Sequence, residues 1–258
     1  PQEKIRGFLT MYQFFVEPDQ IDVAGKSVII RGADVNHIKN VLRMRPGEEV
    51  AVSNGIDGRE YRCGILALEE DCVRLELRFI KEDGVELPAK IYLFQGLPKA
   101  DKMELIIQKA VELGAFQVIP VAMKRCVVKL DEKKADSKIK RWQGIAEAAA
   151  KQSKRGVIPT VAPVMRYAQA VKMASEMDLK LVPYELAEGM EQTKQLIESV
   201  KPGQRIAIFI GPEGGFNPEE IHTATEAAIQ PITLGKRILR TETAGFTTIA
   251  WLMYQLEN

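Results

Sequence analysis

The sequence predicts two domains, a small β-barrel with one helix followed by a larger α/β domain built on a parallel sheet. The first observation behind this prediction is a series of short apolar runs in the first 80 residues, separated by Gly, Asp and Asn turns. The second is a change, after a polar stretch at 81–88, to strands that alternate with helices over about 170 residues. A chain of 258 residues is long enough for both domains to bury a core.

The first domain is expected at residues 11–80. Asp34 is a plausible N-cap for its one helix, which Pro46 and Gly47 end. The expected buried stripe of that helix consists of Val35, Ile38, Val41 and Leu42. Residues 1–10 precede the first Met and are interpreted as an N-terminal extension, and 81–88 as a linker. Partial alternation of apolar residues predicts strands at 12–16, 27–30, 49–53, 60–66 and 72–79.

The second domain is expected at residues 89–258. The continuous apolar runs at 179–184 and 205–210 are typical of strands buried on both faces of a parallel sheet. Further strands are predicted at 90–95, 116–121 and 231–234, and helices at 137–151 and 244–256. A helix capped by Asp101 has an apolar stripe made of Met103, Ile106, Ile107, Ala110 and Val111.

The composition excludes several classes of protein. Hydrophobic residues make up 46% of the chain and charged residues 28%, which excludes a disordered chain or a fibre. Cys63, Cys72 and Cys126 form no metal-ligand pattern with the two histidines, so we expect neither a metal site nor a disulfide framework. Scattered thiols favour a reducing compartment, the cytoplasm. The apolar runs are too short to cross a bilayer, so we expect no membrane partner.

Charge is balanced overall but unevenly distributed. The chain has 36 Lys and Arg against 35 Asp and Glu, yet residues 95–160 hold 14 basic against 7 acidic side chains. Such a local field can steer a polyanion, although solvated helix faces would produce the same count. Lysines and arginines of this segment lie beside predicted strand ends and on one helix face, which favours contact with a phosphate backbone over the reading of bases.

A glycine-rich loop at 211–217 follows the buried strand at 205–210. Gly211, Gly214 and Gly215 let the backbone approach a ligand closely, and Asn217 is expected to cap the next helix, with Pro218 in its first position. The loop matches neither a Walker sequence nor a dinucleotide fingerprint, and two glutamates at the helix start would repel a pyrophosphate. We therefore expect a loop for a ligand other than phosphate, with a plain tight turn as the alternative.

A second loop, 234–244, places three cations and one carboxylate among apolar residues before the last helix. The ordinary interpretation is that Thr241 caps the helix while Arg240 and Glu242 pair on the surface. A functional role for the same charges is equally compatible with the sequence.

At these residues the chain resembles the bacterial ribosomal small-subunit uridine-N3 methyltransferase family, within the SPOUT class of knotted methyltransferases. The resemblance runs from about Met11 to the C-terminus. It is carried by residues 36–43, by Gly-Leu-Pro-Lys-Ala-Asp-Lys at 96–102, by 108–114, by 141–142, 147–149 and 152–153, and by 210–216 and 234–244. Gln13 stands where members often have Arg, and Cys126 stands where Ser is common.

The resemblance implies a PUA-like β-barrel, a SPOUT domain with a deep trefoil knot, and a homodimer that methylates N3 of a specific uridine in 16S ribosomal RNA of the small subunit. It also implies S-adenosylmethionine as the cofactor. By position, the cofactor would contact Val182, Pro183, Tyr184, Glu185, Ile210, Gly211, Pro212, Glu213, Gly214, Gly215, Leu234, Gly235, Ile238 and Leu239. The basic residues expected to contact RNA are Arg43, Lys99, Lys102, Lys109, Lys124, Arg125, Arg141 and Arg155.

Methylation of uracil N3 requires loss of the N3 proton, because the neutral N3–H has no free lone pair. Arg240 is the candidate cation that stabilises the resulting anion. Glu213 or Glu242 is the candidate proton acceptor, or the group that orients Arg240. Two alternatives stay open at this point: an RNA-binding protein without catalysis, and a nucleotide-dependent α/β enzyme, which the missing phosphate motif disfavours.

Overall fold

The structure, a computed structural model, describes residues 11–82, 84–187 and 189–257. The chain divides into two compact units, Pro1–Glu86 with Ala150–Ile158 and Leu87–Ala149 with Pro159–Asn258. The sequence prediction places 150–158 in the second domain, whereas the structure groups this segment with the first unit. The predicted extension at 1–10 lies outside the described residues.

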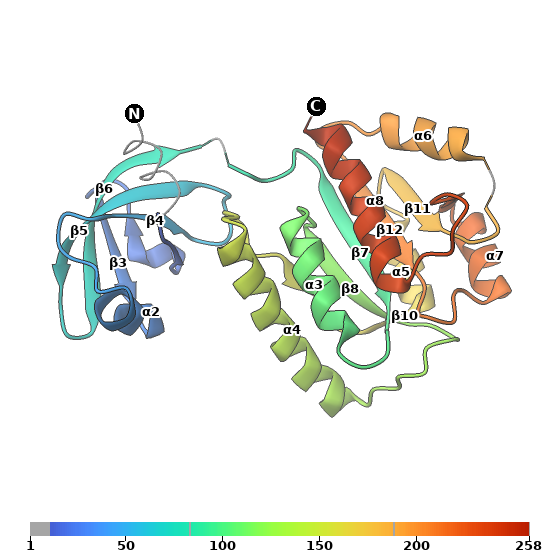
Figure 1. The fold of residues 1–258 in the computed structure, drawn as a ribbon, viewed down its shortest axis with the longest axis horizontal. Coiled ribbons are helices and arrows are strands. Elements are labelled where there is room, and N and C mark those ends of the chain that lie inside the picture. The colour runs from blue at the N-terminus through green and yellow to red at the C-terminus, as the bar shows by residue number, and fades with distance from the viewer. Residues whose placement is uncertain (1–10, 83, 188, 258) are drawn as a thin grey trace. The chain divides into compact units, whose positions relative to one another are not determined.

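The first unit is built on a six-stranded mixed sheet, an open half-barrel in the order β1-β4-β5-β6-β3-β2 (Figure 1). β1 runs parallel to β4, and the other neighbours are antiparallel. Its core includes Val28, Val50 and Leu75, all fully buried. The predicted β-rich domain is confirmed, with β2 and the short η1 (Pro18–Gln20) as additions. The strands are β1 Gln13–Phe15, β2 Ile21–Asp22, β3 Ser27–Arg31, β4 Glu49–Ser53, β5 Glu60–Leu68 and β6 Cys72–Lys81.

The predicted helix of this unit is a short α2 (Ala33–Asn36) that continues as a π-helical turn, η2 (His37–Val41). Gly32, and not Asp34, occupies the N-cap position. The Leu42 N–H donates to the His37 carbonyl, five residues back, at 2.9 Å. A wider turn rotates the following residues away from a 3.6-residue stripe. Val41 is consequently 62% exposed, so its predicted place in the buried stripe is wrong.

The second unit is built on a parallel sheet in the order β10-β8-β7-β12-β11-β13, with β9 also paired to β8. Every strand pair in it is parallel, which confirms the prediction. Phe94 and Phe209 stack between β7 and β12 with ring centroids 4.5 Å apart. The strands are β7 Lys90–Gly96, β8 Gln117–Ala122, β9 Thr160–Val161, β10 Met165–Arg166, β11 Leu179–Pro183, β12 Arg205–Ile210 and β13 Gln230–Ile232.

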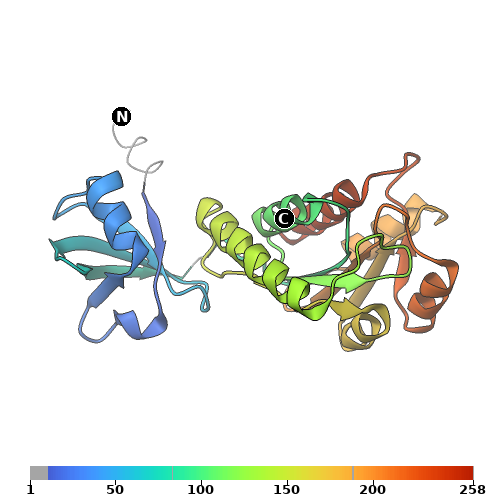
Figure 2. The same cartoon turned by 90° about the horizontal axis from the view of Figure 1, so that it is seen from below.

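Helices cover both faces of this sheet. Figures 1 and 2 show α3 and α8 side by side on one face, with α5 and α7 on the other. The five predicted stripe residues of α3 are all buried. α4 begins five residues before its predicted start, and α5 and α6 were not predicted. The helices are α3 Lys102–Glu112, α4 Glu132–Gln152, α5 Tyr167–Ala174, α6 Met190–Glu198, α7 Pro218–Glu226 and α8 Thr241–Leu256.

Parallel pairing brings the carboxyl ends of neighbouring strands to one edge of the sheet, where open α/β sheets bind ligands. The loops that follow β7, β8, β12, β11 and β13 therefore gather at this edge. The trefoil knot stays a prediction, since strand order does not define how the chain is threaded. Within the described ranges, the helices are all too short or too polar to cross a membrane.

Candidate functional site

A cavity of about 520 Å³ opens at this edge of the second unit, a volume within the range of small-molecule sites. Three loops form most of its wall: the ends of β11, β12 and β13 each continue into one of them. The lining consists of Lys102, Pro183, Tyr184, Glu185, Ile210, Gly211, Pro212, Glu213, Gly214, Gly215, Phe216, Thr233, Leu234, Gly235, Lys236, Arg237, Ile238, Leu239, Arg240, Thr241 and Ala244.

The structure thus brings together all the residues predicted to bind the cofactor except Val182, which is fully buried within β11. Sequence reasoning missed Phe216 and Thr233 and assigned Lys102 to RNA alone. Phe216 directly follows the glycines, and Thr233 directly follows β13, so position after a strand end was the signal that could have found both.

The glycine loop is tightly packed, and side chains at its glycines would crowd or strain it. A Cβ at Gly211 would lie 3.1 Å from both the Gly215 carbonyl carbon and the Phe216 ring. Gly215 has φ +68°, a conformation that favours glycine. The predicted Asn217 cap of α7 is confirmed, because Asn217 Oδ1 accepts from the Glu219 N–H. The Asn217 N–H donates to Glu220, which completes a capping box. The loop is therefore fixed at both ends.

Thr241 connects the glycine loop to the last helix. Its hydroxyl donates to the Gly211 carbonyl at 2.6 Å and accepts from Gln95 Nε2 at 2.9 Å. Gln95, at the end of β7, is fully buried. Arg240 and not Thr241 occupies the N-cap position of α8, so the predicted cap is wrong. The Thr241 hydroxyl instead links three separate elements beneath the cavity.

Two carboxylates and one ammonium lie together at the cavity. Lys102 Nζ is 3.1 Å from Glu213 Oε1 and 3.6 Å from Glu242 Oε2. Glu213 also accepts the Lys99 backbone N–H at 3.0 Å. Burial acts to raise the pKa of Glu213, but hydrogen bonds from backbone N–H groups and the Lys102 ammonium outweigh it and lower that pKa. Glu213 is therefore an anion at neutral pH.

Most of the predicted RNA-contacting cations of the second unit are paired with carboxylates of the same unit. Lys109 pairs with Glu112 at 2.7 Å and Arg141 with Glu104 at 2.8 Å. Arg125 Nη1 donates to the Gly214 carbonyl at 2.9 Å, and Lys124 pairs with Glu219. Lys99 is exposed, as is Arg43 in the first unit.

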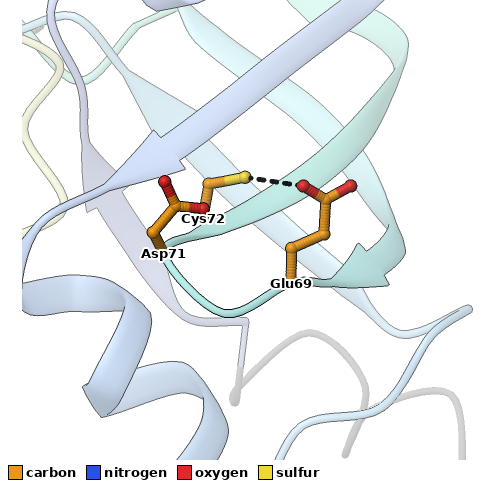
Figure 3. Close-up of side chains that lie close together, drawn as sticks. All are labelled: Glu69, Asp71 and Cys72. Carbon is orange, nitrogen blue, oxygen red and sulfur yellow. Dashed lines mark hydrogen bonds between the residues drawn. The ribbon is translucent and has the colours of Figure 1, made fainter.

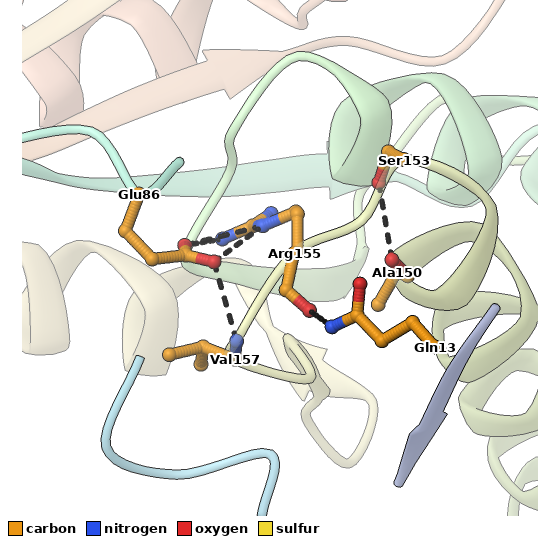
Figure 4. Close-up of polar contacts among 6 residues, drawn as sticks. All are labelled: Gln13, Glu86, Ala150, Ser153, Arg155 and Val157. Carbon is orange, nitrogen blue, oxygen red and sulfur yellow. Dashed lines mark hydrogen bonds and ion pairs between the residues drawn. The ribbon is translucent and has the colours of Figure 1, made fainter. Parts of the chain in front are cut away.

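Arg155 does not lie on an RNA-facing surface, which corrects the prediction. It is 3% exposed within the first unit, where its guanidinium makes a forked contact with Glu86 at 2.5 and 3.2 Å (Figure 4). Its carbonyl accepts from Gln13 Nε2 at 2.9 Å. Helical spacing does not apply to Arg155, because α4 ends at Gln152 and residues 150–158 belong to the first unit.

Glu69, Asp71 and Cys72 form the one group, among the residues described, close enough to share a metal ion (Figure 3). Cys72 Sγ donates to Glu69 at 3.2 Å, and Arg74 pairs with the same carboxylate at 2.6 Å. The hydrogen bond to Glu69, then burial, raises the pKa of the Cys72 thiol. The raised pKa keeps the Cys72 thiol protonated, whereas a cysteine binds a metal ion as the thiolate. The arrangement therefore disfavours a metal ion at this group.

Known proteins match the chain over almost its whole length. Residues 85–253 match a family model described as an RNA methyltransferase domain, and residues 30–77 one described as an RNA methyltransferase PUA domain. A curated relative from Bacillus subtilis, named Ribosomal RNA small subunit methyltransferase E, is 38% identical over 96% of this chain and 98% of its own. A Synechocystis relative of the same name is 33% identical over 97% of this chain and 80% of its own.

Solved structures agree with these matches. A Ribosomal RNA small subunit methyltransferase E from Neisseria gonorrhoeae, bound to S-adenosyl methionine, has a TM-score of 0.80 and 32% identity and covers 95% of this chain and 98% of its own. A Legionella pneumophila protein solved with bound SAM has a TM-score of 0.81 and 30% identity at the same coverage.

Proposed function

The chain belongs to the ribosomal RNA small subunit methyltransferase E family, and we propose that it transfers the methyl group of S-adenosylmethionine to N3 of one uridine in 16S ribosomal RNA. The observation that supports this most is the cavity at the carboxyl edge of the parallel sheet, with a glycine loop at its wall and carboxylates beside it. We further propose that the enzyme is a homodimer, that it acts in the cytoplasm, and that its substrate is the small ribosomal subunit.

The residues of the cavity fit S-adenosylmethionine. Pro183, Ile210, Leu234 and Leu239 provide apolar walls suited to the faces of an adenine. A Cβ at Gly211 would crowd the Gly215 backbone and the Phe216 ring, so glycine keeps the main chain there open to a ligand. The anionic Glu213 provides a carboxylate for the positively charged part of the ligand. When bound, the cofactor supplies an electrophilic methyl group on a positively charged sulfur.

Residues of the chain would then accept the N3 proton of uracil and stabilise the negative charge that develops on the base. Glu213 or Glu242 would accept the N3 proton of uracil, which would free the N3 lone pair for the electrophilic methyl group that the cofactor supplies. Arg240, exposed at the N-cap of α8 and part of the cavity wall, would stabilise the negative charge on the uracil carbonyls. Positioning of the base against the methyl group would supply a further large part of the reduction in the activation barrier.

The exposed cations supply contacts for the flanking phosphates. Lys99, Lys124, Arg125 and Arg141 are exposed on the second unit, Lys109 is half-buried there, and Arg43 is exposed on the first unit. The target base must leave its stack to reach the cavity, so an extruded or single-stranded uridine is expected. Arg155 is left out of this set because it is buried against Glu86.

The experiment combines labelled S-adenosylmethionine with small subunits from a strain that lacks the enzyme, followed by mapping of the modified nucleoside. We expect one N3-methyluridine in 16S RNA. Arg240→Ala should keep cofactor binding, measured by calorimetry, and lose about 100-fold or more in turnover, in line with the loss of one charge-stabilising donor. Absence of cofactor binding in the unaltered protein would favour an RNA-binding protein instead, and normal turnover of Arg240→Ala would remove Arg240 from the mechanism.

A further inference from the structure

Lys102 occupies an unusual place for a residue expected to contact RNA. It is the first residue of α3, and its side chain is 28% exposed and lines the cavity. Its ammonium lies between two carboxylates that come from distant parts of the chain, Glu213 after β12 and Glu242 in the first turn of α8. An ammonium engaged by two carboxylates has little capacity left for a phosphate.

The two carboxylates are not equivalent. Glu213 lines the cavity, and its Oε1 already accepts the Lys99 N–H in addition to Lys102. Glu242 is more buried, with a side chain 15% exposed, and its Oε2 has no hydrogen-bond partner among the described residues. The Lys102 ammonium 3.6 Å from that oxygen is thus its main source of compensation. A buried carboxylate oxygen without a donor is unfavourable, so Glu242 restrains Lys102 strongly.

The geometry points to Lys102 as a positioning residue for the proposed methyl transfer. Its ammonium, held by Glu242, fixes the Glu213 carboxylate at the cavity and does not bind an RNA phosphate. This assignment rests on the proposed function. It also divides the two carboxylates by role, because Glu213 meets the substrate while Glu242 acts through Lys102. Glu213 is then the group that accepts the N3 proton.

The charges around Glu213 predict how it titrates when Lys102 is lost. Burial raises the pKa of Glu213, whereas its own backbone N–H, the Lys99 N–H and the Lys102 ammonium lower it. The other charged groups in the same cavity wall are Glu185, Lys236, Arg237 and Arg240. Removing the ammonium takes away one of the groups that lower this pKa, while burial still raises it and the backbone N–H groups of Lys99 and Glu213 still lower it. Loss of Lys102 should therefore raise the pKa of Glu213 from its lowered position, and the acidic limb of the pH–rate profile should move to higher pH with it.

The test uses Lys102→Met, which keeps the length of the side chain and removes the charge, with Lys102→Arg and Lys99→Met as its matched variants. Lys99→Met retains the backbone N–H that contacts Glu213, so it removes an exposed cation from the same loop and nothing else. The readouts are kcat with saturating unmethylated small subunits, the pH profile of kcat, and the salt dependence of subunit binding. Carbon NMR of the Glu213 carboxyl group gives its pKa without any need for activity, and thermal melts show that each variant folds.

We expect Lys102→Met to lower kcat at least tenfold, to raise the Glu213 pKa and to leave the salt slope unchanged, with partial recovery in Lys102→Arg. Lys99→Met, which removes a proposed phosphate contact, should leave the pKa of Glu213 unchanged and reduce the salt slope by about 0.7 to 0.9, as loss of one phosphate contact does. The assignment is overturned if Lys102→Met keeps kcat and the Glu213 pKa while its salt slope falls. Failure of the unaltered protein to methylate RNA would instead overturn the proposed function, and the NMR titration would still decide whether Lys102 controls Glu213.

Discussion

Replacement of Thr241 by Val should destabilise the second unit and weaken cofactor binding together. The substitution keeps the shape of the side chain but removes the hydroxyl that donates to the Gly211 carbonyl at 2.6 Å and accepts from Gln95 at 2.9 Å. Each hydrogen bond contributes about 1 kcal/mol, and the Gln95 N–H left unpaired in a fully buried site adds about 1 to 3 kcal/mol. We expect a loss of about 3 kcal/mol in the free energy of unfolding.

The assay is urea denaturation followed by tryptophan fluorescence. Trp142 and Trp251 both lie in the second unit, so the signal reports on that unit without the first. Thr243→Val is the matched control, because Thr243 is exposed two residues further along the same helix and should change stability by less than about 0.5 kcal/mol. Equal midpoints for the two variants would refute the role of Thr241 as a structural link, whatever happens to cofactor binding.

Three further predictions concern the first unit. Arg155→Met should destabilise it by about 3 to 5 kcal/mol, because it leaves Glu86 charged and partly buried, and adding Glu86→Leu should recover part of the loss in circular-dichroism melts. Burial raises the pKa of Cys63 to about 12 from its ordinary value of 9, so the thiol ionises at lower pH in the unfolded chain than in the folded one. The free energy of unfolding should therefore fall as the pH rises above 9. A Cys63→Ala variant should lack this part of the decrease in stability at alkaline pH. Ile38→Ala should lose about 2 to 5 kcal/mol whereas Val41→Ala loses under about 1, and the reverse order would contradict the π-helical turn.

The sequence predicted those parts of the fold that depend on local pattern. The apolar stripe from Met103 to Val111 predicted a helix and the continuous apolar run at 205–210 a buried strand, and both were confirmed. Short elements such as β9 and the π-helical turn depend on pairing and packing partners distant in the chain, so they carry too little periodic signal. Arg155 shows the same limit, because its burial depends on Glu86, which lies 69 residues earlier.

The candidate site was predictable where function constrains the backbone and less so where side chains meet across the fold. The partners of the Asn217 cap lie two and three residues away, so the local sequence was enough to identify the glycine loop and its cap. The contact of Lys102 with Glu213 and Glu242 requires knowledge of which strands lie next to each other. Sequence spacing alone suggested that Lys102 pointed to RNA.

The uneven charge of the chain has a second explanation once the sheet order is known. β8, β7 and β12 are neighbours and parallel, so the basic loops after β7 and β8 face the acidic loop after β12. Lys102 pairs with Glu213, Arg125 holds the Gly214 carbonyl, and Lys124 pairs with Glu219 at the start of α7. Part of the basic segment therefore binds the cavity wall of its own unit, and only its remaining exposed cations are left to attract RNA. For this reason we expect RNA binding to depend on salt less steeply than the 14 basic residues of 95–160 would suggest.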